Sequence, residues 1–360
     1  MTEDRSLSLP TGNTDAPALT TMPATEISRE AERLNLEALE ISLSEMCKDL
    51  RLAGMAAGIY RGPELLWFKG FGFSDLAEKT PVTQDTPFHL ASLTKTFAST
   101  LLMQLVEQGK LDLDTPAATF GIDLESRGTI TVRHLLSHTS EGKPGERYRY
   151  NGSRFAQLEH VFEQITGRSF KDNLEEIIIK PLGLKNTGGM ADALEVRLAS
   201  PYQLDATGNL IRGNYPASFS CSAGLIASVA DYATYIASLK QNFFLQPQTQ
   251  AIALTPTKSP KGRTHPYGLG WFVETIEGTR VIWHYGYWDS VSTLVIIVPE
   301  TNLTFLAFAN SDALSSGIDL DRGHIARSPA GLIFLENFVL APGRTLPRFN
   351  ILDSIRRIFR

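Results

Sequence analysis

The stretch F-H-L-A-S-L-T-K-T-F-A-S, residues 88–99, places Lys95 three positions after Ser92. Apolar residues then recur at three- and four-residue steps, which predicts a helix that begins at or near Ser92 and ends at Gln108, before Gly109. Residues three apart on a helix share a face, so we expect the serine hydroxyl and the lysine amine to lie side by side. The helix N-terminus adds unpaired backbone N–H groups and a positive dipole end beside the serine.

This pairing of side chains has a chemical use. A serine hydroxyl is a poor nucleophile and needs a base within hydrogen-bonding reach. A lysine serves as that base if burial or nearby positive charge lowers its pKa from about 10.4 towards neutrality. An isolated S-x-x-K is far more often a helix cap followed by an exposed lysine, so the interpretation depends on the rest of the chain.

Composition indicates a globular protein, with 360 residues of which 42% are hydrophobic and 20% charged. The net charge of −5 argues against nucleic acid as a partner, because phosphate neutralisation needs clustered Lys and Arg. The two cysteines, Cys47 and Cys221, give no disulfide framework. The first residues lack the pattern of a signal peptide, and no segment has the roughly 20 apolar residues of a transmembrane helix. We therefore expect a cytoplasmic protein, with export left open.

Apolar and turn patterns divide the chain into segments. Residues 1–25 are rich in Ser, Thr, Pro and Asp without periodicity, which predicts a disordered leader. Periodicity over 26–52 predicts an amphipathic helix, and two strands in a hairpin follow around Gly62 and Pro63. Four further strands are predicted from the runs W-F-V-E-T (271–275), V-I-W-H-Y-G (281–286), S-T-L-V-I-I-V (292–298) and L-T-F-L-A-F-A-N (303–310).

Strands at both ends and helices between them predict an α+β fold. One antiparallel sheet is built from both chain ends, is flanked by terminal helices and carries an inserted, mostly helical region. The expected catalytic domain spans 26–345, with an α/β lobe over about 26–115 and 262–342 and a helical lobe over about 116–261. The pattern of apolar and basic residues in the tail, 346–360, predicts a basic amphipathic helix. It could contact an anionic membrane surface, but docking on the protein's own body or on a second subunit is the interpretation we favour.

Six groups of short strings occur along the chain in a fixed order: S-L-T-K, then L-L-S-H-T-S with K-P-G-E-R-Y-R-Y, then I-T-G with K-P-L-G-L-K-N-T, then S-A-G-L-I-A-S, then Y-G-L-G-W, then H-Y-G. In this order they resemble the serine β-lactamase and penicillin-binding-protein superfamily, in its class C-like branch. That branch includes family VIII esterases, D-amino-acid peptidases and acyltransferases. The resemblance runs from about Gly54 to Asn310 and implies a β-lactamase/transpeptidase-like version of the predicted fold.

The resemblance implies roles for several residues. Ser92 matches the nucleophile that forms an acyl-enzyme, and Lys95 matches the lysine that accepts or shuttles its proton. Tyr150 matches the tyrosine of the Y-x-N element, which assists proton transfer. His284 replaces the lysine of the third motif, K-T-G, so we expect it on the edge strand, donating a hydrogen bond to the substrate or to Tyr150. By analogy, the backbone N–H groups of Ser92 and Tyr287 form the oxyanion hole.

The sequence departs from the family pattern at the tyrosine element, which reads Tyr150-Asn151-Gly152. Gly152 takes the position of an asparagine that helps to hold the substrate amide and the catalytic lysine, while Asn151 lies on the other side of an alternating backbone. With His284 in place of a lysine, the cationic anchor for a β-lactam carboxylate is lost at neutral pH. This weakens a β-lactamase function and leaves acyl transfer from an ester or small amide intact. Gly286 allows the backbone to approach a ligand closely.

Other residues have simpler explanations. His134 and His138 have the i, i+4 spacing of a zinc pair, but no acidic residue lies between them as in H-E-x-x-H, and we expect no metal. Cys221 lacks a base partner and is expected to pack. Tyr287 and Trp288, which follow the H-Y-G string, are expected either to line an apolar substrate pocket or to pack.

These observations lead to a first hypothesis and two alternatives. The first is a serine hydrolase or acyltransferase that acts on esters or small amides through an acyl-Ser92 intermediate. One alternative is a D-amino-acid-type peptidase or weak β-lactamase. The other is a catalytically degenerate relative that binds a ligand or forms a scaffold, which Gly152 keeps open. The expected partner is a small-molecule ester or amide, with no cofactor and no nucleic acid.

Overall fold

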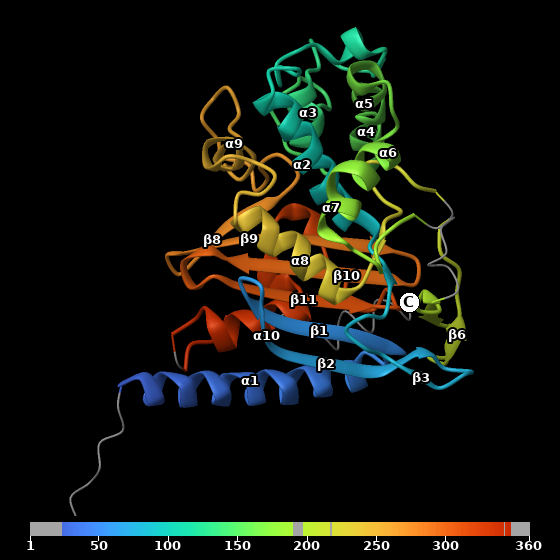
Figure 1. The fold of residues 1–360 in the computed structure, drawn as a ribbon, viewed down its shortest axis with the longest axis vertical. Helices are drawn as coiled ribbons and strands as arrows, with labels where there is room; N and C mark the ends of the chain where they lie inside the picture. The colour runs from blue at the N-terminus through green and yellow to red at the C-terminus, as the bar shows by residue number, and fades with distance from the viewer. Residues whose placement is uncertain (1–23, 190–196, 217, 342, 347–360) are drawn as a thin grey trace, which may run out of the picture.

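The computed structural model describes most of the chain (Figure 1). The described ranges are 24–189, 197–216, 218–341 and 343–346. The predicted leader and the predicted basic tail fall almost entirely outside these ranges. Within the described part of the chain, no helix combines the length and the apolar character that a membrane span requires.

The centre of the molecule is a seven-stranded antiparallel sheet with the order β3-β2-β1-β11-β10-β9-β8. Its strands are β1 (Gly54–Arg61), β2 (Glu64–Asp75), β3 (Thr80–Pro81), β8 (Phe272–Ile276), β9 (Thr279–Trp288), β10 (Val291–Val298) and β11 (Leu303–Ala309). The N-terminal hairpin joins the C-terminal strands through β1 and β11, with Met55 opposite Ala309. This confirms one antiparallel sheet built from both chain ends. The prediction that His284 lies on an edge strand is wrong, because β9, which carries it, is covered by β8 at this edge of the sheet.

Helices cover both faces of this sheet (Figure 1). On one face lie α1 (Ala24–Asp49) and α10 (Pro329–Phe338), and on the other lies α8 (Val229–Lys240). Successive strand residues point to opposite faces, so Leu294 packs with the first pair of helices and its neighbour Val295 packs on the side of α8. The apolar run of β10 is therefore continuous because both of its faces are buried.

Most of the remaining elements lie between β3 and β8 in the sequence and form a mostly helical region with its connections. The helices are α2 (Thr94–Glu107), α3 (Val132–Leu136), α4 (Gly152–Ala156), α5 (Glu159–Thr166), α6 (Phe170–Leu174), α7 (Lys180–Leu182) and α9 (Pro247–Ala253), with shorter turns η1 (Ala91–Leu93), η2 (Ala117–Phe120), η3 (Glu175–Ile179), η5 (Pro299–Thr301), η6 (Leu320–Arg322) and η7 (Ile325–Arg327). Two small sheets pair β4 (Phe88–His89) with β7 (Ile226–Ala227), and β5 (Tyr202–Leu204) with β6 (Leu210–Arg212). Ser92 lies on η1, directly before α2.

Strand β9 passes so close to the chain before Ser92 that no side chain fits between them. A Cβ atom on Gly286 would lie 2.1 Å from the Leu90 carbonyl oxygen and 2.2 Å from Thr293 Oγ1. The Thr293 hydroxyl donates a hydrogen bond to the same Leu90 oxygen at 2.9 Å. The sheet thus holds the turn that carries Ser92.

This contact predicts that Gly286→Ala is destabilising. The added methyl group must displace backbone, so we expect the free energy of unfolding, measured by urea titration, to fall by about 1–3 kcal/mol. Gly152→Ala is the matched control, because its Cβ atom would meet only Lys95 Nζ, at 3.8 Å, and should change stability by less than about 0.5 kcal/mol. Equal stability of the two variants would contradict the close packing.

Candidate active site

Ser92 and Lys95 meet as the helical spacing predicts. Lys95 Nζ lies 2.9 Å from Ser92 Oγ, and it donates a second hydrogen bond to the Ser222 carbonyl oxygen at 2.8 Å. The lysine side chain is almost completely buried, with 1% of its surface exposed. Its amine is therefore fixed between the serine hydroxyl and one backbone carbonyl from the S-A-G string.

Burial lowers the pKa of Lys95 from its ordinary 10.5 to about 7. A buried ammonium group loses its hydration, and the neutral Ser222 carbonyl does not offset the charge. At neutral pH a large share of the Lys95 amines is therefore uncharged. The uncharged amine is the form that can accept the Ser92 proton.

The turn before Ser92 is strained and clamped. Ala91 has a φ of +46°, which non-glycine residues seldom adopt and which costs of order 1–3 kcal/mol. Its N–H donates to His89 Nδ1 at 3.1 Å, and its carbonyl accepts from the Thr94 hydroxyl at 2.7 Å. That hydroxyl also accepts from the Leu225 N–H at 3.1 Å. Hydrogen bonds from both sides thus hold the backbone conformation that presents Ser92.

Tyr150 lies against the lysine. Lys95 Nζ is 5.0 Å from the centre of the Tyr150 ring. Burial raises the pKa of Tyr150 above its usual range, and the neighbouring Ser92 hydroxyl opposes that change. The two hydroxyls do not reach hydrogen-bonding geometry, and the buried Tyr150 hydroxyl has no partner among the described residues. Tyr150 is therefore a protonated phenol at neutral pH, with its O–H available to a third group.

Asn151 and Gly152, which follow Tyr150, face different surroundings, as the alternating backbone predicts. Gly152 faces the lysine, since a Cβ atom there would lie 3.8 Å from Lys95 Nζ. The Asn151 side chain instead caps α4: its oxygen accepts from the Arg154 N–H at 3.0 Å and its amide donates to Glu141 Oε1 at 2.6 Å. These bonds commit Asn151 to the loop, so that of these two residues only Gly152 lies beside the lysine.

His284 differs from the expectation in its hydrogen bonds. It is fully buried on β9, and its Nδ1 lies 2.8 Å from the Tyr285 carbonyl oxygen. A carbonyl can only accept, so Nδ1 carries the proton; Nε2 of the neutral ring then accepts from the Tyr267 hydroxyl at 2.8 Å. Burial and the charge of Lys95 lower the pKa of His284 to about 3. The predicted donation to Tyr150 is wrong, because both ring nitrogens of His284 are occupied.

A cavity of about 590 Å³ opens at Ser92. It is lined by Ser92, Tyr150, Tyr285, Tyr287, Ser315, Gly317, Ile318, Asp319 and Asp321. The predicted Tyr287 thus borders the cleft, whereas Trp288 is 41% exposed and does not line it. The carboxylates of Asp319 and Asp321 line the cavity, and the charge of Asp321 contributes to the raised pKa of Tyr150.

Sequence reasoning missed three contributors to this site. One is the Ser222 carbonyl, and another is the Tyr267 hydroxyl, although both residues lie in strings that the sequence marked. The third is the segment 315–321, which closes one wall of the cleft. Its only signal is a stretch of small and acidic residues after the last strand, S-D-A-L-S-S-G-I-D-L-D-R-G, which is typical of loops in general.

The remaining candidates have structural contacts. Cys221 is fully buried and donates to Glu159 Oε2 at 3.3 Å, and burial raises the pKa of its thiol well above the usual range. His134 accepts from the Thr131 N–H at 3.1 Å at the start of α3. His138 accepts from the Asn151 N–H at 3.1 Å, and its ring lies 4.2 Å from that of Tyr150. The two histidines therefore support different parts of the loop.

Comparison with known proteins agrees with this fold. A family described as Beta-lactamase matches residues 37–327, and the chain therefore belongs to the β-lactamase family of serine hydrolases. Penicillin-binding protein 4* of Bacillus subtilis (strain 168) is 23% identical over 304 residues, which are 70% of this chain and 66% of that protein. The chain spans between 59% and 66% of the length of the first curated relatives that it matches.

Solved structures share the fold. The octameric penicillin-binding protein homologue from Pyrococcus abyssi superposes with a TM-score of 0.72 at 24% identity, over 76% of this chain and 73% of that chain. EstCE1, described as a hydrolase with promiscuous acyltransferase activity, superposes with a TM-score of 0.66 at 20% identity, over 85% and 99%. The predicted α+β, β-lactamase/transpeptidase-like fold is confirmed.

The lowered pKa of Lys95 predicts how Ser92 reacts with a serine-directed phosphonate. Below a pH of about 7 the amine is protonated and cannot take the Ser92 proton; above it the amine is neutral. We expect the labelling rate, followed by intact-protein mass spectrometry, to rise about tenfold per pH unit below that point and then level off. Lys95→Arg stays charged throughout and should lower the rate by about 100-fold or more. A wild-type rate that is the same at acidic and alkaline pH would contradict a lysine base.

Proposed function

We propose that this protein is a serine hydrolase or acyltransferase that acts on esters or small amides through an acyl-Ser92 intermediate. The observation that carries this proposal is the buried Lys95 amine, 2.9 Å from Ser92 Oγ, with its pKa lowered to about 7. A buried, largely neutral amine in contact with a serine hydroxyl is the arrangement that activates a serine nucleophile.

The proposed reaction has two stages. Ser92 Oγ attacks the substrate carbonyl while Lys95 takes the hydroxyl proton, and the backbone N–H groups of Ser92 and Tyr287 hold the oxygen that gains negative charge. The carbonyl carbon then expels its alcohol or amine, which receives a proton from the Tyr150 phenol, and Lys95 returns a proton to Tyr150. Water or an acceptor alcohol attacks the acyl-Ser92 ester in the second stage and releases the acyl group.

Charges in the cleft support esters and small amides over β-lactams. The neutral His284 offers no cation to a β-lactam carboxylate, because its pKa is lowered to about 3. Asp321 lines the same cleft and would repel that carboxylate, whereas Asp319 is paired with Arg322 at 3.5 Å and with Arg327 at 3.4 Å. The Asp321 carboxylate favours a second candidate function, a D-amino-acid-type peptidase, since it would attract the protonated amine of an amino-acid amide.

Turnover of three substrates tests these functions. We expect a short p-nitrophenyl ester to be hydrolysed with an acyl mass increment on Ser92, and nitrocefin to react about 100-fold more slowly or not at all. Faster turnover of D-amino-acid p-nitroanilides than of the ester would favour the second candidate.

Two serine variants provide the control for this assay. Ser92→Ala should lower kcat/KM for the ester by about 10³-fold or more. Ser99→Ala removes a buried hydroxyl from the same helix, where it donates to the Leu269 carbonyl oxygen, and should retain most of the activity. The absence of turnover and of any adduct, with Ser92→Ala indistinguishable from wild type, would leave only the degenerate ligand-binding alternative.

A further inference from the structure

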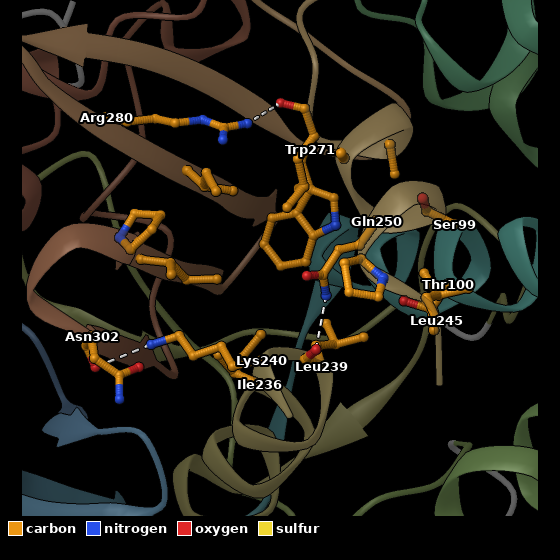
Figure 2. Close-up of a pocket in the computed structure, with 17 residues that line it drawn as sticks. Ser99, Thr100, Ile236, Leu239, Lys240, Leu245, Gln250, Trp271, Arg280 and Asn302 are labelled. Carbon is orange, nitrogen blue, oxygen red and sulfur yellow. Dashed lines mark hydrogen bonds between the residues drawn. The ribbon is translucent and has the colours of Figure 1, made fainter. Parts of the chain in front are cut away.

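A second cavity, of about 390 Å³, lies beside the middle of α2, where Ser99 and Thr100 line it (Figure 2). It is enclosed by α2, α8 and α9 together with strands β9 and β10, and it shares no lining residue with the Ser92 cleft. Its volume falls in the range of roughly 300–1,000 Å³ that is usual for small-molecule sites. The proposed reaction gives this cavity no role.

The lining combines an apolar surface with two cations. The apolar side chains include Trp271, Ile282 and Ile297, whereas Lys240 and Arg280 carry positive charge. None of the 17 residues that line the cavity is Asp or Glu. The cavity is therefore apolar and positively charged at once.

The hydrogen-bond acceptors of the Lys240 and Arg280 side chains are neutral oxygen atoms. Lys240 Nζ donates to the Asn302 carbonyl oxygen at 3.1 Å and to Thr304 Oγ1 at 3.0 Å. Arg280 donates one N–H to the Leu254 carbonyl oxygen at 2.6 Å (Figure 2). These acceptors satisfy N–H groups without offsetting the charges, and burial lowers the pKa of Lys240 to about 8. An anion in the cavity would reduce the free-energy cost of burying these positive charges.

Arg280 is the side chain best placed to bind such an anion. Two of the other polar side chains that line the cavity are engaged: Gln250 donates to the Leu239 carbonyl oxygen at 2.8 Å, and the Ser99 hydroxyl donates to that of Leu269 at 2.5 Å. A guanidinium group has five N–H donors, of which Arg280 uses one here. The remaining donors match a carboxylate, which accepts two parallel hydrogen bonds.

We propose that this cavity binds a small amphipathic carboxylate of the medium-chain fatty-acid type. Its carboxylate binds Arg280, the charge of Lys240 adds attraction, and its apolar body lies against Trp271, Ile282 and Ile297. The proposal concerns binding alone and does not depend on the reaction at Ser92.

Calorimetric titration of octanoate tests this site, on protein whose Ser92 has first been blocked by a phosphonate so that the cleft makes no contribution. If Ser92 proves unreactive, Ser92→Ala replaces the blocked protein. We expect octanoate to bind, octanol to bind at least about tenfold more weakly, and octylammonium not to bind. Arg280→Gln should weaken octanoate binding by about tenfold or more while octanol binding stays unchanged.

Two further variants complete the test. Ala251→Trp extends a large side chain from the exposed surface of α9 into the cavity and should abolish binding of both octanoate and octanol. Arg33→Gln, a matched change on the exposed surface of α1, should leave both affinities unchanged. Circular dichroism establishes that each variant is folded. Equal affinities for octanoate and octanol, no binding of octanoate, or octanoate binding that neither Arg280→Gln nor Ala251→Trp alters would each overturn the proposal.

Discussion

The site depends on the burial of one amine. A lysine at the start of a helix would ordinarily extend into water and remain an ammonium ion. Here all ten residues of α2 from Thr94 to Met103 are buried, so among the described residues the amine of Lys95 has only Ser92 Oγ and the Ser222 carbonyl as hydrogen-bond partners. The helix tolerates this all-round burial because the sheet packs below it and the helical region surrounds it. The reactivity that we propose for Ser92 is a consequence of that packing.

The same packing sets the direction of the serine. Strand β9 approaches the Leu90 carbonyl at a point where only glycine fits, Gly286, and the turn that follows holds Ala91 in the left-handed region. A second close approach occurs further along the helix, where a Cβ atom on Gly270 would lie 2.4 Å from Ser99 Cβ. Gly286 and Gly270 thus allow the sheet and the loop before β8 to pack closely against α2 and the turn that precedes it. The stability of the sheet offsets the strain of the turn.

The sequence alone predicted the parts of this site that depend on local spacing. The three-residue step placed Ser92 beside Lys95, alternation and turn residues predicted the six long strands, and the match to the family's tyrosine element placed Gly152, not Asn151, beside the lysine. What the sequence did not predict depends on pairing between distant segments. The bond from Tyr267 to His284 arises where the loop before β8 folds against β9, and the cleft wall at 315–321 is an irregular segment without periodicity. The cations of the second cavity, Lys240 and Arg280, are brought together only by tertiary packing.

The most direct test of the account is the pKa of Lys95 itself, measured by NMR titration of protein labelled at the lysine side chains. Comparison with Lys95→Arg assigns its signal and separates it from Lys240, whose pKa is also lowered, to about 8. We expect a lysine signal that titrates near pH 7 and is lost in Lys95→Arg. A Lys95 signal that titrates near its ordinary value of 10.5 would contradict it, because the amine would then be charged at neutral pH and unable to accept the Ser92 proton.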